Sequence, residues 1–175
     1  MILQQALARC RTLVVEGPDG LDRRPFLAEL ARHRFTIRPL HGHLHHVDPT
    51  QPYRELLSAP GRLAVDGGLV HELVYGPLRR GRSRVTWIQA LDFAEAVAER
   101  GGALVHLTGR TDDAEAVGAE AVGAEAVGAY ERVLRPLAQH VPVITLDTGE
   151  PAGAAHDPSR PVRQLGFCVG LLPIA

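Results

Sequence analysis

Short apolar runs alternate with segments of helical periodicity along most of the chain. Five runs have the length and apolar content of buried strands: 12–16, 35–40, 62–66, 103–107 and 141–146. Between them, apolar residues recur every three to four positions, which predicts helices at 2–9, 23–33, 53–57, one or two within 69–100, and one over 113–139. Strands that alternate with helices in this way indicate an α/β fold with a mostly parallel sheet.

The length of 175 residues suits a single domain that covers 1–175. Pro, Gly and Ala dominate 151–161, which we expect to be irregular, and 167–172 is a candidate for a last strand or a covering segment. The sequence Ala-Glu-Ala-Val-Gly occurs three times in tandem over 114–128. Because a step of five residues turns a helix by about 500°, the repeated valines do not form one apolar stripe. We interpret the repeat as a tolerant surface helix, with a partner-binding arm as the alternative.

Composition narrows the classes of function. A formal net charge of −1, from 19 basic and 20 acidic residues, argues against a general nucleic-acid binder or a polybasic membrane-surface protein. No apolar run reaches the roughly 18 to 20 residues of a spanning helix, so we expect no membrane segment. Cys10 and Cys168 lie far apart, which favours a reducing, cytoplasmic location without a disulfide framework. Lysine is absent, and this excludes Schiff-base chemistry and the usual phosphate-loop lysine.

Residues 12–24, TLVVEGPDGLDRR, place a strand, a glycine-containing turn and the start of a helix in succession. This is the layout of a phosphate-binding loop, in which backbone N–H groups at a helix N-terminus surround an anion. The usual pattern is Gly, four residues, Gly, Lys and then Ser or Thr. Counted from Gly17, the last three positions are Asp22, Arg23 and Arg24. The candidate phosphate loop therefore consists of Gly17, Pro18, Asp19, Gly20, Asp22, Arg23 and Arg24.

The stretch 12–20 resembles the phosphate loop of thymidylate kinases and related small deoxynucleotide kinases, many of them carried by phages. The resemblance continues through His41-Gly42, Asp48-Pro49, Tyr53, Leu63 to Asp66, and Tyr75-Gly76-Pro77 with Arg80-Gly81. It implies a three-layer α/β/α sandwich of the P-loop nucleotide-kinase type, with a five-stranded, mostly parallel sheet. It also implies transfer of the ATP γ-phosphate to a nucleotide with the help of magnesium.

The loop departs from that family where phosphate is handled. Arg23 stands in place of the lysine, and its planar guanidinium does not mimic a compact ammonium. Arg24 replaces the hydroxyl that holds magnesium. Asp22 replaces a glycine, and we expect it to cap the following helix and fill the anion site itself. Asp66, where the family usually has Asp-Arg, is followed by Gly67.

These changes predict a degenerate, catalytically impaired or inactive kinase-like protein, without a cofactor, kept for a binding or structural role in an assembly. One alternative is an active ATP- and magnesium-dependent deoxynucleoside or deoxynucleotide kinase, with Arg23, Asp66 and Arg80 as catalytic candidates. The other alternative is a nucleotide-binding sensor that does not transfer phosphate. Expected partners are a second copy or an assembly component, and a nucleotide under either alternative. The resemblance suggests a bacterial or phage-encoded protein, with association with a virion as a further option.

The remaining candidates carry weaker signals. By family analogy, Glu72, Tyr75, Arg80 and Arg82 are candidates for contacts with substrate, and packing or a solvated basic surface is the competing interpretation. His41, His43 and His45 share one face if their segment is extended, which would suit zinc or nickel. Because no cysteine lies near and the spacing fits no closed structural site, we expect no metal there.

Overall fold

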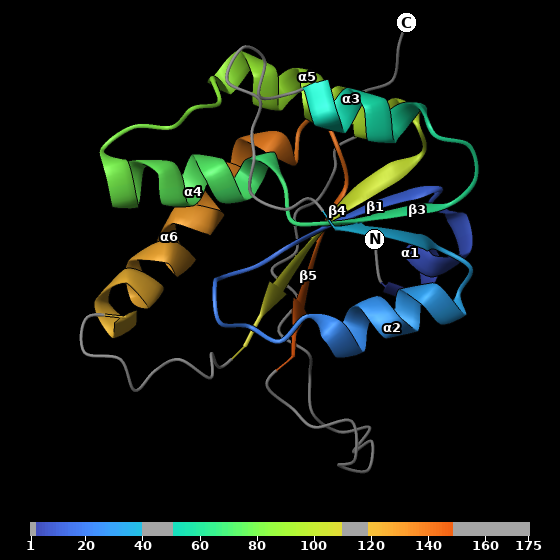
Figure 1. Cartoon of the computed structure of the whole chain (residues 1–175), viewed down its shortest axis with the longest axis horizontal. Helices are drawn as coiled ribbons and strands as arrows, with labels where there is room; N and C mark the ends of the chain where they lie inside the picture. Colours follow the sequence, from blue (N-terminus) through green and yellow to red (C-terminus); the bar gives the residue numbers. More distant parts are fainter. Residues whose placement is uncertain (1–2, 40–50, 110–118, 149–175) are drawn as a thin grey trace, which may run out of the picture.

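The computed structural model describes residues 3–39, 51–109 and 119–148 of the chain. A central sheet lies between two helical layers (Figure 1), so the predicted three-layer α/β/α sandwich is confirmed. The elements in chain order are α1 (Leu3–Arg9), β1 (Thr12–Glu16), α2 (Arg24–Arg32), β2 (Thr36–Pro39), α3 (Gln51–Ser58), β3 (Leu63–Asp66), α4 (Leu69–Arg80), α5 (Trp87–Glu99), β4 (Gly102–Thr108), α6 (Ala119–Leu137) and β5 (Val143–Asp147).

The sheet has five parallel strands in the order β2-β3-β1-β4-β5. Strand β1 is central, since Thr12 is in register with Leu63 of β3 on one side and Gly102 of β4 on the other. The chain moves from β1 outward to β2, returns to β3, and then crosses to β4 on the far side. Open α/β sheets bind ligands outside the carboxyl ends of the strands at such a switch point.

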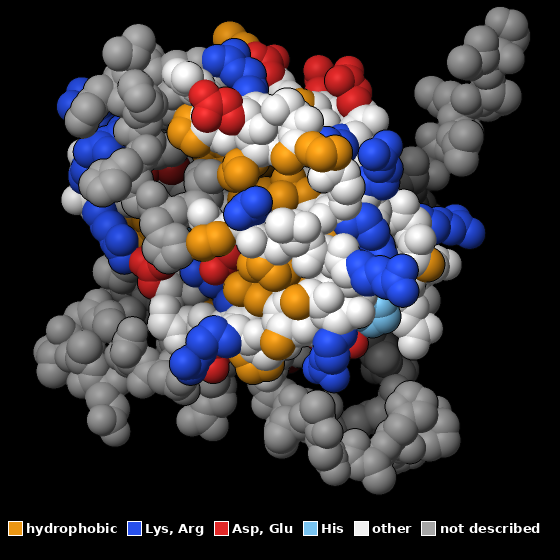
Figure 2. All heavy atoms as spheres, turned by 45° about the vertical axis from the view of Figure 1, so that its right-hand side comes forward, with side chains coloured by type: hydrophobic (Ala, Val, Ile, Leu, Met, Phe, Trp, Pro, Cys, Tyr) orange, Lys and Arg blue, Asp and Glu red, His pale blue; other side chains and the backbone are white. Residues whose placement is uncertain are grey.

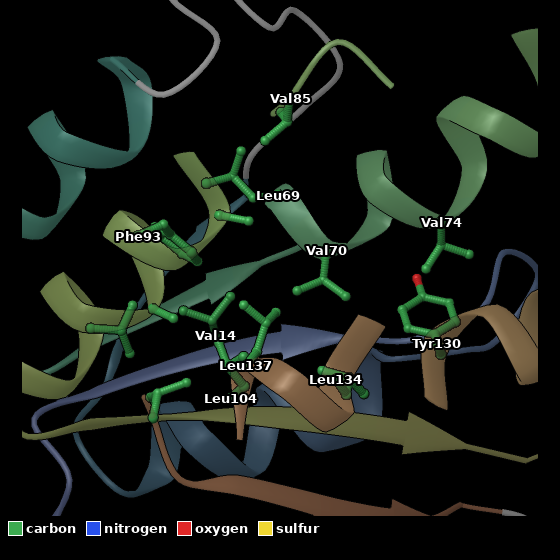
Figure 3. Packing of buried hydrophobic residues seen from close by; sticks show 14 of the residues in the cluster. Val14, Leu69, Val70, Val74, Val85, Phe93, Leu104, Tyr130, Leu134 and Leu137 are labelled. Atoms are coloured by element: carbon green, nitrogen blue, oxygen red, sulfur yellow. The ribbon is translucent and has the colours of Figure 1, made fainter. Parts of the chain in front are cut away.

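Alternate residues of the central strands face different helical layers, as the pleat requires. Val14, Val65 and Leu104 pack against α3 to α6, and the packing is shown in Figure 3. On the opposite face, Leu13, Val15, Ala64 and Val105 pack against α1 and α2. Every residue of β1 is buried, which explains why its sequence is a continuous apolar run rather than an alternating one.

Element boundaries differ from the predictions where local hydrogen bonds decide them. Two helices fill 69–100, because Gly81 ends α4 in the left-handed region at φ 70° and Thr86 begins α5 with a capping box to Gln89. Strand β5 begins at Val143 rather than at Val141, whose N–H bonds to the carbonyl of Leu137 at the end of α6.

Several predictions fall outside the described residues. They concern the start of the long helix at 113–118, the irregular segment 151–161, the candidate strand 167–172, Cys168 and the histidines at 41, 43 and 45. Of the helices that the structure describes, none has both the length and the apolar character that crossing a bilayer requires.

Figure 2 shows the right-hand side of Figure 1 turned forward. Its arginine side chains are spread over the face, with acidic and hydrophobic side chains among them. This distribution agrees with the near-neutral net charge.

Two arginines tie the sheet to its surroundings at the amino ends of the strands. The Arg100 guanidinium donates to the carbonyls of Leu57, Ala59 and Gly61, while its Nε donates to the Thr12 hydroxyl at 2.7 Å. Arg62 in turn donates to the carbonyls of Leu7, Cys10 and His33. Each guanidinium thus satisfies carbonyl groups that no strand or helix pairs.

We expect Arg100→Met to lower the free energy of unfolding by about 2–4 kcal/mol, because it leaves carbonyl groups and the Thr12 hydroxyl without a donor. Urea denaturation measures the change. Arg135→Met, at an exposed position of α6, is the matched control and should cost less than about 0.5 kcal/mol. Equal effects of the two substitutions would contradict this role of Arg100.

Candidate functional site

The carboxyl ends of the central strands and the loop that follows β1 form the candidate site. Strand β1 ends at Glu16, β3 at Asp66 and β4 at Thr108, and parallel pairing places these ends at one edge of the sheet. The loop of residues 17–23 leads from β1 into α2. It corresponds in position to the phosphate loop predicted from the sequence.

Close contacts fix the first half of this loop. A Cβ at Gly17 would lie 2.9 Å from the Leu107 carbonyl oxygen, so only glycine fits there without a shift of the backbone. The Tyr130 hydroxyl of α6 donates to the Gly17 carbonyl at 2.7 Å, and this hydrogen bond is buried. Gly20 adopts φ 77°, and the Leu21 side chain is buried beside Gly17. The loop is therefore packed against the core rather than free.

Helix α4 holds the turn from the other side. The Asp19 N–H donates to the Tyr75 hydroxyl at 2.9 Å, and the Asp19 carboxylate lies 2.9 Å from His71 Nε2 and pairs with Arg79. The hydrogen bond from His71, together with the charges of His71 and Arg79, lowers the pKa of Asp19 against the effect of burial. The Arg79 guanidinium lies 4.6 Å from the centre of the Tyr75 ring. The predicted residues Asp19 and Tyr75 thus meet.

Arg23 and Asp66, both predicted as catalytic candidates, contact each other. Arg23 Nη1 lies 3.3 Å from Asp66 Oδ1, and the two side chains are only 25% and 22% exposed. Neither of these atoms has a hydrogen-bond partner among the described residues. The two side chains therefore form an ion pair without a hydrogen bond, and Arg23 also acts electrostatically on the buried Glu16.

The predicted N-cap role of Asp22 needs correction. Helix α2 begins at Arg24, so the N-cap residue is Arg23, which has a right-handed helical backbone and no capping side chain. Asp22 Oδ1 still accepts the Arg24 N–H at 3.1 Å, and the carboxylate also pairs with the Arg24 guanidinium at 2.7 Å. The prediction was wrong by one residue. Arg23 already adopts right-handed helical angles and Pro25 lies in the first turn, so the N-cap position falls on Arg23 rather than on Asp22.

Glu16 is the main site residue that sequence reasoning missed. It is fully buried, and neither carboxylate oxygen forms a well-aligned hydrogen bond with the described residues, although the N–H groups of Val70 and His71 lie near it. Burial raises its pKa to about 7, opposed in part by His71, Arg23 and the N–H groups of Val70 and His71 at the start of α4. A Cβ at Gly68 would lie 2.2 Å from Glu16 Oε1, so the carboxyl group occupies space that only glycine leaves open.

His106 lies beside Glu16 on the neighbouring strand β4, in register with it. Its ring stacks on Tyr130 with centroids 4.9 Å apart, and burial lowers its pKa to about 4. His106 is therefore neutral at pH 7. The sequence contained a signal for both residues. Glu16 and His106 are each a titratable residue within an otherwise apolar strand, β1 and β4 respectively.

Glu72 and Arg80, predicted to contact substrate, contact each other within the chain. Glu72 is only 12% exposed, pairs with Arg80 and accepts the Arg84 N–H at 2.8 Å. Arg82 is exposed and has no ion pair within the described residues. The histidines at 41, 43 and 45 lie outside those residues, and the described part of the chain contains no group of three His, Cys, Asp or Glu side chains placed to hold a metal.

Comparison with known proteins adds evidence on the fold. No family model and no curated protein matches the chain. Among solved structures, the chain is similar to the YorR protein from Bacillus subtilis, crystallised in complex with phosphorylated GDP, with a TM-score of 0.64 and 17% sequence identity. The match covers 81% of this chain and 88% of YorR. The chain thus has the α/β architecture of that nucleotide-bound protein over most of its length.

We expect Glu16 to lower the stability of the protein as the pH rises from about 4.5 to about 7, because folding raises the pKa of Glu16. The lowered pKa of His106 acts in the opposite direction between about pH 4 and 6.5, so the contribution of Glu16 is measured as the difference between a variant and the wild type. Below pH 4.5 Glu16 is protonated in both states and carries no penalty; above pH 7 the folded state must bury its charge, at a cost of up to about 3 kcal/mol. Glu16→Gln should therefore match the wild type at pH 4.5 and be more stable at pH 8, as measured by urea denaturation.

Glu99→Gln, at an exposed position of α5, is the control and should follow the wild type at every pH. If the difference in stability between Glu16→Gln and the wild type stays constant across this range, Glu16 does not titrate near neutral pH.

Proposed function

We propose that this chain is a nucleotide-kinase-like scaffold that does not transfer phosphate and serves a binding or structural role in an assembly. The fold supports the first half of the proposal, since it resembles that of YorR over most of both chains. The side chains at the candidate site support the second half.

The ion pair between Arg23 and Asp66 is the observation that carries the proposal. Arg23 holds the position where a phosphate loop has its lysine, and it already has a carboxylate partner 3.3 Å away. A triphosphate that reached Arg23 would have to compete with that carboxylate for the guanidinium. The other loop charges are paired as well, Arg24 with Asp22 and Asp19 with His71 and Arg79.

The residues present do not fit a magnesium ion of the usual phosphate-loop kind. Arg24 stands where a hydroxyl would hold the metal, and an arginine does not ligate it. Of the carboxylates at the strand ends, Asp66 is paired with Arg23 and Glu16 is fully buried. The described part of the loop therefore offers no hydroxyl ligand of the kind on which this magnesium site depends.

An active kinase is the second candidate, and two observations favour it. YorR was crystallised with phosphorylated GDP, and Arg23 lies at the carboxyl ends of β1 and β3, where a phosphate would bind. In this alternative Arg23 leaves Asp66 to contact the nucleotide, and Arg80 leaves Glu72 to contact the acceptor.

We expect Mg-ATP, dTMP and GDP to leave the melting temperature of the wild-type protein unchanged within about 1 °C, and we expect no phosphate transfer. A ligand at a hundred times its Kd would add about 2.7 kcal/mol of stability, a shift of several degrees for a domain of this size. Thermal denaturation and a labelled-ATP transfer assay provide the two measurements.

The variant Asp22→Gly/Arg23→Lys/Arg24→Thr is the positive control, because it restores the phosphate-loop pattern from Gly17. It should gain stabilisation by Mg-ATP, while Arg32→Lys, elsewhere on α2, should not. Phosphate transfer by the wild type that is lost in Arg23→Ala would replace the proposal with the active kinase. Stabilisation of the wild type by a nucleotide without phosphate transfer would instead support the third interpretation, a nucleotide-binding sensor.

A further inference from the structure

The connection between α4 and α5 carries arginines whose charges are only partly balanced within the chain. From residue 73 to residue 91 the sequence contains four arginines and no acidic residue. The first two, Arg79 and Arg80, pair with carboxylates elsewhere in the chain. The other two, Arg82 and Arg84, are exposed and form no ion pair within the described residues. Two guanidinium groups are therefore available to a partner.

Exposed apolar side chains follow these arginines at the start of α5. Trp87 is 39% and Ile88 71% exposed, and they are two of the three large hydrophobic side chains that the described residues leave exposed. We call Arg82, Arg84, Trp87 and Ile88 together the basic patch. Tryptophan and arginine are enriched among the residues that contribute most of the binding energy at protein interfaces. The basic patch therefore has the composition of a protein-binding surface.

The backbone that presents the basic patch is held against α4. A Cβ at Gly76 would lie 2.9 Å from Ser83 Cα, so the helix and the connection approach more closely than a side chain would permit. The Arg84 N–H donates to Glu72 Oε1 at 2.8 Å, and the next residue, Val85, is buried in the core (Figure 3). A surface that is already fixed loses less conformational entropy when a partner binds.

Acidic residues limit the basic patch along α5. Asp92 and Glu95 are exposed and follow Ile88 at helical spacing, which places them on the same side of the helix. The positive surface therefore covers only the connection, seen between α4 and α5 in Figure 1, and the first turn of α5. The chain as a whole, with a net charge of −1, supplies no wider positive field. A surface of this extent suits a short acidic segment better than a nucleic-acid strand, which needs a groove that follows several nucleotides.

We propose that the basic patch binds a short acidic segment of a partner protein. Carboxylates of the segment pair with Arg82 and Arg84, because a guanidinium and a carboxylate match in charge and in hydrogen-bond geometry. An apolar side chain of the same segment covers Trp87 and Ile88. The inference names the partner for the assembly role proposed above and rests on that role. Phosphate transfer is measured by the separate ATP assay, so either proposal can fail without the other.

Trp87 is the only tryptophan of the chain, so intrinsic fluorescence reports on the basic patch. The full chain is titrated with a short glutamate-rich peptide that contains a pair of leucines, in 50 mM salt. We expect the emission to shift to shorter wavelength and acrylamide quenching to decrease, because the indole ring loses contact with water. No change at peptide concentrations up to about 1 mM would overturn the proposal. So would a free protein whose emission is already short in wavelength and resistant to acrylamide, since the chain itself would then cover the ring.

Two further ligands test the chemistry of the partner. The same peptide with glutamine in place of every glutamate should bind at least about tenfold more weakly, and 500 mM salt should weaken the acidic peptide in the same direction. Equal binding of the two peptides would overturn the role of charge. Tighter binding of single-stranded oligo-dT than of the acidic peptide would assign the basic patch to nucleic acid and overturn the proposal.

The variant Arg82→Gln/Arg84→Gln removes both charges and keeps Trp87 as the reporter, as well as the backbone N–H that bonds to Glu72. It should raise the Kd of the acidic peptide at least about tenfold while the circular dichroism spectrum stays unchanged. The matched control is Arg9→Gln/Arg11→Gln, which removes two exposed arginines near the amino end of β1 and should bind as the wild type does. Equal weakening by the two variants would show a general effect of net charge and would overturn the proposal.

Discussion

The burial of strand β1 on both faces and along both edges is the constraint on which the rest of the structure depends. A strand enclosed in this way has no access to water, so the chain that leaves it must find all its partners within the protein. The loop after β1 does so through Gly17, which approaches the Leu107 carbonyl and accepts the Tyr130 hydroxyl. Helices α4 and α6 are thereby drawn to the same strand end, and the candidate site forms where they meet.

That site is notable for how completely its charges are balanced inside the chain. The loop carboxylates of Asp19 and Asp22 pair with His71, Arg79 and Arg24, and Arg23 pairs with Asp66. A site that binds a polyanion usually leaves its cations and backbone donors in excess. Here an anionic ligand gains a cation only by displacing a carboxylate. Among the described residues, the buried side-chain atoms without a hydrogen-bond partner are the carboxylate oxygens of Glu16, which lies beneath the loop, and the facing atoms of Arg23 and Asp66.

The same balance is absent on parts of the surface. The connection between α4 and α5 exposes arginines with tryptophan and isoleucine, while α6 exposes Glu125, Val127 and Glu131 together with Arg132 and Arg135. An Ala-Glu-Ala-Val-Gly repeat would be a poor core helix, because its period does not match the helical turn. In its described part the repeat is mixed: Glu125 and Val127 are exposed, whereas Ala126 is buried in the core.

The sequence by itself determined the order of strands and helices, the parallel sheet, and the position of the loop after β1. These follow from local periodicity, glycine and proline positions, and the short range of backbone hydrogen bonding. It also supplied Arg23, Asp66, Asp19 and Tyr75 as site residues. It did not reveal that Arg23 contacts Asp66, that α4 holds Asp19, or that Glu16 and His106 lie together in the interior. Those pairings join residues up to 90 positions apart, and only the packing of α4 and α6 on the sheet decides which side chains meet and which lose contact with water.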